Sequence, residues 1–155
     1  MKIKNVDKKD LNEIHKLEQS IFNEDGFSID LIKELINNNA FFLKLERGIL
    51  KKGLIGIIIA IKDRADRINI INFFINPLYQ RKGYGSLLLK HLIDNIIHLN
   101  EIKKIVLNVN VNNILAIKLY EKFNFRITQK IDNYYCSKEN AFLMELNIDF
   151  FLPSL

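Results

Sequence analysis

The fold of this chain is best recognised from the stretch Asn76-Pro77-Leu78-Tyr79-Gln80-Arg81-Lys82-Gly83-Tyr84-Gly85-Ser86, which joins a predicted strand to the longest predicted helix. Two glycines, Gly83 and Gly85, let the backbone turn tightly and approach a ligand with no Cβ in the way. The helix start offers unpaired N–H groups and a partial positive charge, which suit a phosphate. Arg81 and Lys82 add full positive charges beside it. The stretch therefore indicates an anion-binding turn, or else a glycine-rich helix start with only a structural role.

Two common phosphate-binding motifs do not match this stretch. The Gly-x-x-x-x-Gly-Lys-Ser/Thr loop is absent, because Lys82 precedes the glycines. The dinucleotide pattern Gly-x-Gly-x-x-Gly is incomplete, because Leu88 occupies the third glycine position. The ligand class therefore has to be inferred from the surrounding elements.

Apolar periodicity places strands and helices on both sides of the loop. Three strand segments precede it with short polar turns between them, which is typical of an antiparallel meander. The strands flanking the long helix are expected to be parallel, because a crossover connection demands it. Ser28 is expected to cap the second helix. The predicted strands are 3–6, 40–46, 54–61, 68–75, 105–109, 125–131 and 141–146, and the predicted helices are 11–22, 29–37, 83–100 and 113–123.

This order predicts one α/β (α+β) domain over residues 1–146, followed by a tail over 147–155. Its sheet is mixed and mostly antiparallel, with about six to seven strands and about four helices. The length of 155 residues with 48% hydrophobic and 26% charged residues is typical of one soluble globular domain. The single cysteine, Cys136, excludes an internal disulfide and fits a reducing compartment.

Charge and hydropathy restrict localisation and partners. Residues 1–11 lack the apolar stretch of a signal peptide, and the longest apolar run, 53–61, is less than half the ~20 residues of a spanning helix. We therefore expect a cytoplasmic protein with no membrane partner. The net charge of +5 is scattered, so we expect no direct nucleic-acid binding, and a small anionic ligand explains the basic excess equally well. His91 and His98 lack a third ligand, so no metal site is expected. A monomer or weak oligomer is expected.

Three blocks of sequence resemble one enzyme family. Gln-x-x-Gly-x-Gly at 80–85 resembles the acetyl-CoA pyrophosphate loop of the GNAT N-acetyltransferases. The block 107–125 resembles that family's L-x-V…N…A-I-x-L-Y-x-x-x-G-F stretch. Asn133-Tyr134-Tyr135, followed by Glu139-Asn140-Ala141, is similar to the N-Y-Y…E-D-A ending of protein N-terminal acetyltransferases of the RimI and archaeal types. The resemblance covers nearly the whole chain and implies a GNAT-type domain.

The resemblance implies acetyl-CoA as cosubstrate, with no metal. Backbone groups of the strand before the loop would bind the acetyl and pantetheine parts, and an N–H there would act as an oxyanion donor. The positions that match the family's cofactor contacts are Phe73, Phe74, Ile75, Arg81, Lys82, Gly83, Tyr84, Gly85, Ser86, Asn113 and Tyr120. For Asn113, the sequence supports a role as the N-cap of the following helix as well as it supports a cofactor contact.

Four residues are candidates for the chemistry. Tyr120 matches the family's tyrosine near the departing sulfur, although a packed aromatic explains it without the resemblance. Asn108 stands where RimI-type enzymes have a glutamate base, and Asn69 where other N-terminal acetyltransferases have His or Tyr. Neither asparagine accepts a proton at neutral pH, so the pair is expected to order a water. Glu24, in the loop after the first helix, is the fourth candidate. The alternative is that it is a solvated loop carboxylate with no role in the reaction.

The missing base favours a weakly basic acceptor. An α-amino group has a pKa of about 7.7–8.0, so its deprotonation at pH 7 costs about 1–1.4 kcal/mol, against about 4.6 kcal/mol for a lysine amine. We therefore expect acetylation of protein or peptide N-termini, including ribosomal or nascent chains. Phe27, Tyr134 and Tyr135 would line the peptide groove, or else are ordinary packing residues. The alternatives are acetylation of a small amine such as a polyamine, and a non-catalytic acyl-CoA-binding module.

Overall fold

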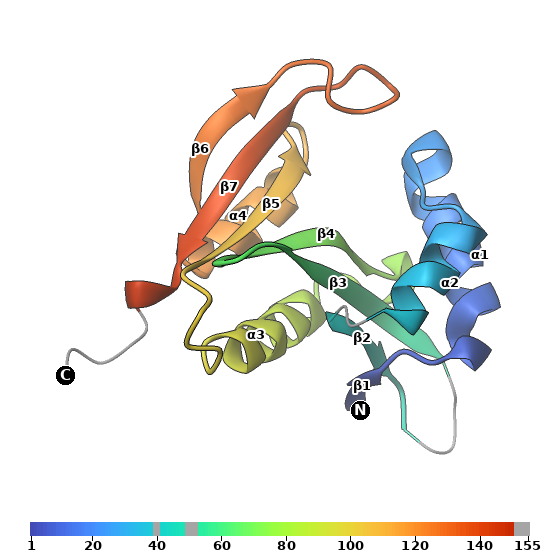
Figure 1. Cartoon of the computed structure of the whole chain (residues 1–155). Coiled ribbons are helices and arrows are strands. Elements are labelled where there is room, and N and C mark those ends of the chain that lie inside the picture. Colours follow the sequence, from blue (N-terminus) through green and yellow to red (C-terminus); the bar gives the residue numbers. More distant parts are fainter. Residues whose placement is uncertain (39–40, 49–52, 151–155) are drawn as a thin grey trace. The chain divides into compact units, whose positions relative to one another are not determined.

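The structure, a computed structural model, describes residues 1–38, 41–48 and 53–150 (Figure 1). Its strands form one seven-stranded sheet in the order β1-β2-β3-β4-β5-β7-β6. The strands are β1 Lys2–Asn5, β2 Phe41–Glu46, β3 Leu54–Arg64, β4 Arg67–Ile75, β5 Lys104–Asn110, β6 Arg126–Ile131 and β7 Ala141–Asn147. The helices are α1 Leu11–Phe22, α2 Ile29–Asn37, α3 Tyr84–Ile96 and α4 Ile114–Lys122, with short 3-10 turns η1 Lys8–Asp10, η2 Asn23–Asp25, η3 Pro77–Tyr79 and η4 Ile148–Phe150. The predicted α/β class and strand count are confirmed.

The chain divides into two compact units that share the strands β3 and β4 and the helix α3. The first unit is Met1–Ala60 with Asn72–Leu92, and the second is Ile61–Ile71 with Ile93–Leu155. The division falls inside these three elements and not at a linker between elements. The predicted extent of the domain, 1–146, stays a prediction.

In the first unit, α1 and α2 pack side by side (Figure 1). The Ser28 side chain accepts a hydrogen bond from the N–H of Leu31 at 3.2 Å, so the predicted cap of α2 is confirmed. Helix α2 buries Ile32 and Leu35, whereas α1 buries Ile14 and the carboxylate-bearing Glu18. The buried stripe of α1 thus contains an acidic residue where periodicity predicts only apolar ones.

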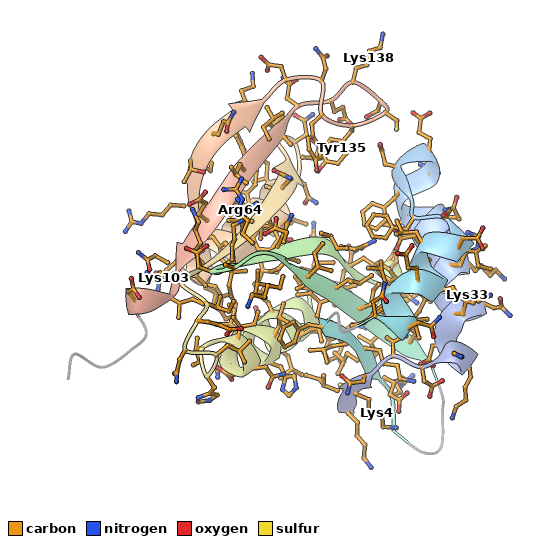
Figure 2. All side chains as sticks on the ribbon, in the orientation of Figure 1. Lys4, Lys33, Arg64, Lys103, Tyr135 and Lys138 are labelled. Carbon is orange, nitrogen blue, oxygen red and sulfur yellow. The ribbon has the colours of Figure 1, made fainter. Side chains whose placement is uncertain are left out.

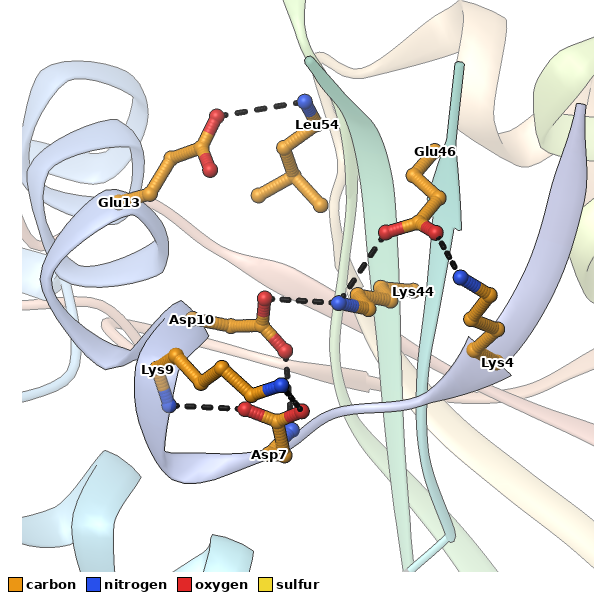
Figure 3. Close-up of polar contacts among 8 residues, drawn as sticks. All are labelled: Lys4, Asp7, Lys9, Asp10, Glu13, Lys44, Glu46 and Leu54. Carbon is orange, nitrogen blue, oxygen red and sulfur yellow. Dashed lines mark hydrogen bonds and ion pairs between the residues drawn. The ribbon is translucent and has the colours of Figure 1, made fainter. Parts of the chain in front are cut away.

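An ion-pair cluster ties β1, η1 and β2 together in the same unit (Figure 3). The ammonium of Lys44, with a buried side chain, lies 2.7 Å from Asp10 and 3.1 Å from Glu46, and Lys4 also pairs with Glu46. Burial alone would lower the pKa of Lys44, but the two carboxylates raise it above its usual value. Because both partners are present, this buried cation is compensated and holds the edge of the sheet.

In the second unit, parallel and antiparallel pairs meet at β5. Strand β4 pairs with β5 in parallel from Arg67↔Lys104 to Ile70↔Leu107, so the predicted crossover geometry is confirmed. Strand β7 pairs antiparallel with both β5 and β6. At the β3–β4 turn, Arg67 binds Asp63 through two hydrogen bonds of 2.9 and 2.7 Å. These bonds, Arg67 foremost, hold the pKa of Asp63 below its ordinary value.

Several predicted boundaries differ from the structure, among them the end of β3, which lies at Arg64 and not at residue 61. The long helix ends at Ile96 and not at residue 100, because the Leu99 N–H turns back to the Ile96 carbonyl at 2.8 Å. Its apolar stripe faces the core, with five buried residues: Leu88, Leu89, Leu92, Ile93 and Ile96. Residue 147 ends β7, and Ile148 is buried with its N–H on the Lys103 carbonyl at 2.8 Å. The last predicted tail residues, 151–155, lie outside the described residues.

Candidate active site

The loop 76–83 is built from its own polar side chains. Asn76 caps η3 by accepting the Leu78 N–H at 3.1 Å, and its backbone N–H binds the Ile55 carbonyl at 2.8 Å. The Gln80 side chain donates to the Ile75 carbonyl at 3.0 Å. The glutamine of the Gln-x-x-Gly-x-Gly motif therefore fastens the loop to the end of β4, which is a positioning role.

The N-terminus of α3 has the geometry expected of an anion site. Arg81 (φ 59°) and Gly83 (φ 81°) both adopt the left-handed conformation, which brings the chain sharply into the helix. The Gly83 carbonyl accepts the first helical bond, from Leu87 at 3.1 Å. Helix geometry then leaves the N–H groups of residues 83–86 without an intrahelical acceptor. These four residues, all predicted to bind the cofactor, fit a diphosphate group by donor chemistry and by helix dipole.

The two basic residues of the loop differ in what holds them. Arg81 and Lys82 are both exposed. Lys82 donates to the Leu78 carbonyl at 3.2 Å, and its ammonium lies 5.7 Å from the Tyr79 ring centre. Arg47, at the end of β2, lies 5.9 Å from the same ring. Cationic groups thus gather around Tyr79, beside the helix start.

The end of β4 lies tightly against β3. The Phe74 ring is buried and meets the Phe22 ring edge-on at 6.1 Å, while Phe73 and Ile75 are half-buried. Gly56 on β3 lies so close that a Cβ there would be 2.5 Å from the Phe74 carbonyl oxygen and 2.5 Å from Ile75 Cδ1. The backbone predicted to bind the acetyl group is therefore fixed by a close approach that only glycine allows.

The loop between α1 and α2 contains two predicted site residues, Glu24 and Phe27. It is bonded to Glu18 on α1, which the sequence analysis did not predict. Glu24 is exposed on η2, and Phe27 is half-buried. The Phe27 N–H donates to Glu18 Oε1 at 3.0 Å, and the Gln19 side chain donates to the Phe27 carbonyl at 3.1 Å. Glu18 also accepts from the Asn72 side chain at 2.6 Å. The only sequence signal for Glu18 was a charged residue on the apolar stripe of a helix.

In the second unit, Asn108 and Tyr134 come together. The Asn108 side-chain N–H donates to the Tyr134 hydroxyl at 3.0 Å. This bond fixes the amide, and its oxygen, Oδ1, is buried with no hydrogen-bond partner in the described part of the chain. A buried, oriented acceptor without a donor is costly unless a ligand supplies one.

Tyr120 lies in the core of the second unit. Its side chain is buried against the Phe125 ring at 5.7 Å. Burial, and then the proximity of Tyr135, raise the pKa of the Tyr120 hydroxyl above its ordinary value. The hydroxyl therefore stays protonated at neutral pH and remains a hydrogen-bond donor.

The two tyrosines of the β6–β7 loop are held in place by the residues that follow them. Their rings meet edge-on at 4.9 Å, and both backbone N–H groups donate to the Glu139 carbonyl, at 3.0 and 3.2 Å. The Asn140 side chain accepts the Asn133 N–H at 2.9 Å. Figure 2 shows Tyr135 and Lys138 on this loop, with Lys138 pointing away from the strands. The Glu-Asn pair of the third sequence block thus shapes the loop that presents Tyr134.

The two other predicted asparagines already have protein partners. Asn69 donates to Asp63 Oδ2 at 3.3 Å, beside the Arg67 ion pair. Asn113 accepts the Ala116 N–H at 3.1 Å and so caps α4. The structure brings Asn108 and Tyr134 into contact and ties Asn69 to a carboxylate. The water shared by Asn69 and Asn108 stays a prediction.

Comparison with known proteins fits this geometry. The model of the acetyltransferase (GNAT) family matches residues 9–125, which include the helix start, Asn108 and Tyr120. The chain belongs to the GNAT acetyltransferase family. A Bacillus subtilis spermine/spermidine N(1)-acetyltransferase is 41% identical over 66 residues, covering 43% of each chain. The Escherichia coli [ribosomal protein bS18]-alanine N-acetyltransferase is 36% identical over 86 residues, covering 54% of this chain and 57% of that enzyme.

One solved GNAT structure aligns with nearly the whole chain, although at a lower sequence identity. The crystal structure of the E. coli ribosomal-protein-S18-alanine N-acetyltransferase has a TM-score of 0.81 at 27% identity, over 95% of this chain and 93% of that one. The alignments with the curated relatives, by contrast, span only about half the length of those proteins, from 43% to 57%. The predicted resemblance to GNAT enzymes is confirmed, while the relatives divide between protein N-terminal and polyamine acceptors. In the described residues, no helix has the length and apolar character needed to span a bilayer.

Proposed function

We propose that this GNAT protein transfers the acetyl group of acetyl-CoA to the α-amine of a protein or peptide N-terminus. The observation that carries the proposal is the hydrogen bonding of the Asn108 side chain. Its amide is held by Tyr134, and its buried oxygen lacks a donor within the described residues. An amine N–H supplies that donor, but an amide does not remove a proton at neutral pH. The acceptor must therefore lose its proton easily.

The acidity of the nucleophile separates the candidate acceptors. At pH 7 an α-amine with a pKa of about 7.7–8.0 is deprotonated for about 1–1.4 kcal/mol, whereas an amine at about 10.4 costs about 4.6 kcal/mol. The difference of roughly 3 kcal/mol corresponds to a factor of more than about 100 in the neutral fraction. Without a base at position 108, an N-terminal amine is the better nucleophile.

A polyamine is the second candidate acceptor, because a B. subtilis relative of this chain is named as a spermine/spermidine N(1)-acetyltransferase. Polyamines are polycations whose amines have lysine-like pKa values, so they benefit from a base and from an acidic surface. This chain has a net charge of +5, which opposes the approach of a polycation. Both the charge and Asn108 favour the N-terminal amine.

Each half of the reaction has its own residues in this proposal. The N–H groups of residues 83–86 hold the diphosphate, and the backbone of Phe73, Phe74 and Ile75 holds the acyl arm and polarises its carbonyl. Acetyl-CoA supplies the acyl group and a thiol leaving group. The new bond joins the amine nitrogen to the acetyl carbon as the carbon–sulfur bond breaks. Tyr120 Oη–H donates its proton to the departing sulfur, and the proton that the amine nitrogen loses returns to the Tyr120 oxygen through water.

The acceptor side is assigned to three aromatic residues. Tyr134 and Tyr135 bind the peptide backbone, and Phe27 packs the first side chain. Glu24 and Asn69 are secondary candidates for handling the amine proton through water, and Asn113 is a CoA contact in addition to its capping role.

The test is an acetylation assay that follows release of the CoA thiol. The acceptors are peptides with a free N-terminus varied at the first two positions, the same peptides N-acetylated but containing lysine, and spermine. We expect turnover with free N-termini and little with the other two. Faster turnover with spermine selects the polyamine reading. Tight CoA binding with no thiol release for any amine selects a non-catalytic acyl-CoA-binding module.

A further inference from the structure

Glu18 and Asn72 form a buried polar pair that the reaction above does not use. Glu18 is 1% exposed and Asn72 is 8% exposed. Glu18 Oε1 accepts two hydrogen bonds, from Asn72 Nδ2 at 2.6 Å and from the Phe27 N–H at 3.0 Å. The other oxygen of each group, Glu18 Oε2 and Asn72 Oδ1, is buried without a partner among residues 1–38, 41–48 and 53–150.

Glu18 Oε2 and Asn72 Oδ1 are thus both buried acceptors that lack a hydrogen-bond donor in the described part of the chain. If Glu18 were ionised, both oxygens would remain unsatisfied in a site closed to solvent, which costs folding free energy. One proton on Oε2 turns it from an acceptor into a donor. Because Oε1 already accepts from the Asn72 amide, a bond from Oε2–H to Asn72 Oδ1 closes a ring of two hydrogen bonds. The same proton then satisfies both oxygens.

Burial outweighs the hydrogen bonds and the charge that favour the ionised form of Glu18. Burial is the largest influence and raises the pKa of Glu18, against the hydrogen bonds from Phe27 and Asn72 and the charge of His15 on the same helix. From β4 the facing group is the uncharged Asn72, and from the α1–α2 loop it is a backbone N–H. His15 is the ionisable neighbour that acts on Glu18.

We propose that Glu18 is a neutral carboxylic acid in the folded protein and acts as a positioning residue for the acceptor side of the site. It joins Asn72, which directly precedes the Phe73–Ile75 segment of β4, to the backbone of Phe27. The part of this inference that concerns substrate rests on the proposed function, since Phe27 is assigned there to the first side chain of the peptide. The joint fixes the loop that carries Phe27 relative to the strand end in the same unit.

The experiment compares Glu18→Gln, Glu18→Ala and a control, Glu34→Gln, which changes an exposed carboxylate on α2. Glutamine keeps the shape of glutamic acid and always carries an N–H donor where the neutral acid carries O–H. Carbon-13 NMR of glutamate side chains and infrared spectroscopy at neutral pH report a neutral carboxylic acid. We expect that signal in the wild-type protein and in Glu34→Gln, and its loss in Glu18→Gln.

Thermal unfolding and kinetics give two further readouts. Glu18→Gln should unfold at or above the wild-type temperature, whereas Glu18→Ala should unfold well below it. With a free-N-terminus peptide that the wild-type enzyme acetylates, Glu18→Ala should raise the peptide KM about tenfold with little change in CoA affinity, and Glu18→Gln should keep the wild-type KM. A missing neutral-acid signal, or a Glu18→Gln protein as unstable as Glu18→Ala, overturns the proposal. If no peptide is acetylated, the proposed function fails, while the spectroscopic and thermal results still decide the state of Glu18.

Discussion

Replacing Gly56 by alanine tests how closely β3 supports the strand end that is proposed to bind the acetyl group. The new Cβ would lie 2.5 Å from the Phe74 carbonyl oxygen, whereas Cβ atoms are essentially never found within 3.0 Å of another heavy atom. Ile75 Cδ1, also at 2.5 Å, is a side-chain end that rotates away, but the carbonyl moves only with its backbone. The substitution must therefore displace β3 or β4.

The expected cost follows from these contacts. Overpacking costs about 1–3 kcal/mol, and a backbone contact places Gly56→Ala in the upper half of that range. Alanine also restricts the unfolded chain, which returns about 0.4–1 kcal/mol. The net loss of about 1–2.5 kcal/mol lowers Tm by about 2–10 °C, at about 2–4 °C for each kcal/mol in a chain of this size.

Gly48→Ala is the matched control, since no atom of the residues that the structure describes lies within 4 Å of a Cβ at this position. It undergoes the same change in the unfolded chain, so its Tm should stay the same or rise slightly. Circular dichroism melts and urea midpoints measure both variants, and calorimetry with acetyl-CoA reports whether the displaced strand end binds more weakly. If Gly56→Ala melts together with Gly48→Ala, the strand is not held by the close approach, and the reasoning is refuted.

Three further predictions concern the chemistry. Tyr120→Phe should lower kcat by about 10²-fold or more while calorimetry finds CoA affinity nearly unchanged, and equal kcat values would remove Tyr120 as the acid. Tyr134→Phe should raise the peptide KM about tenfold, because the Asn108 amide loses the hydroxyl that fixes it; an unchanged KM would contradict that role. The kcat/KM of the wild-type enzyme should rise with pH up to the pKa of the peptide amine, about 7.7–8.0, and the midpoint should move when the peptide amine is changed. A midpoint that ignores the peptide would point to an enzyme base.

Local signals in the sequence predicted much of the fold. Helix α2 needs only the Ser28 cap and the apolar stripe of its own residues, so its bounds were predicted in full. The parallel pairing of β4 with β5 follows from the handedness and length of a crossover, which hold whatever the side chains are. The end of α3 was predicted too late, because the turn at Leu99 depends on a single backbone bond that periodicity does not carry.

The polar partners of the site could not be predicted in the same way. The partner of Glu18 lies 54 positions away on another strand, and no pattern within one element encodes such a bond. Asn69 stays a predicted site residue, and the sequence did not predict that its side-chain N–H donates to Asp63 across the β3–β4 turn. For Asn113 the sequence left capping and cofactor binding open, and the structure shows the cap. Nonlocal hydrogen bonds decide which polar residues remain available to a substrate.

Asn72 and Asn108 present the same chemical feature, a buried amide oxygen without a donor, yet their surroundings assign them different roles. The amide of Asn72 is bonded to a carboxyl group, and a carboxyl group supplies the missing donor by keeping one proton. The amide of Asn108 is bonded to the Tyr134 hydroxyl as a donor, so that bond cannot also satisfy its own oxygen. In the two proposals, therefore, the first oxygen is satisfied within the protein, whereas the second is left for a donor that arrives with the substrate. A neutral primary amine brings that donor and needs no base to do so. This is why the asparagine at position 108, although it replaces the usual glutamate, is consistent with acetyl transfer to an N-terminus.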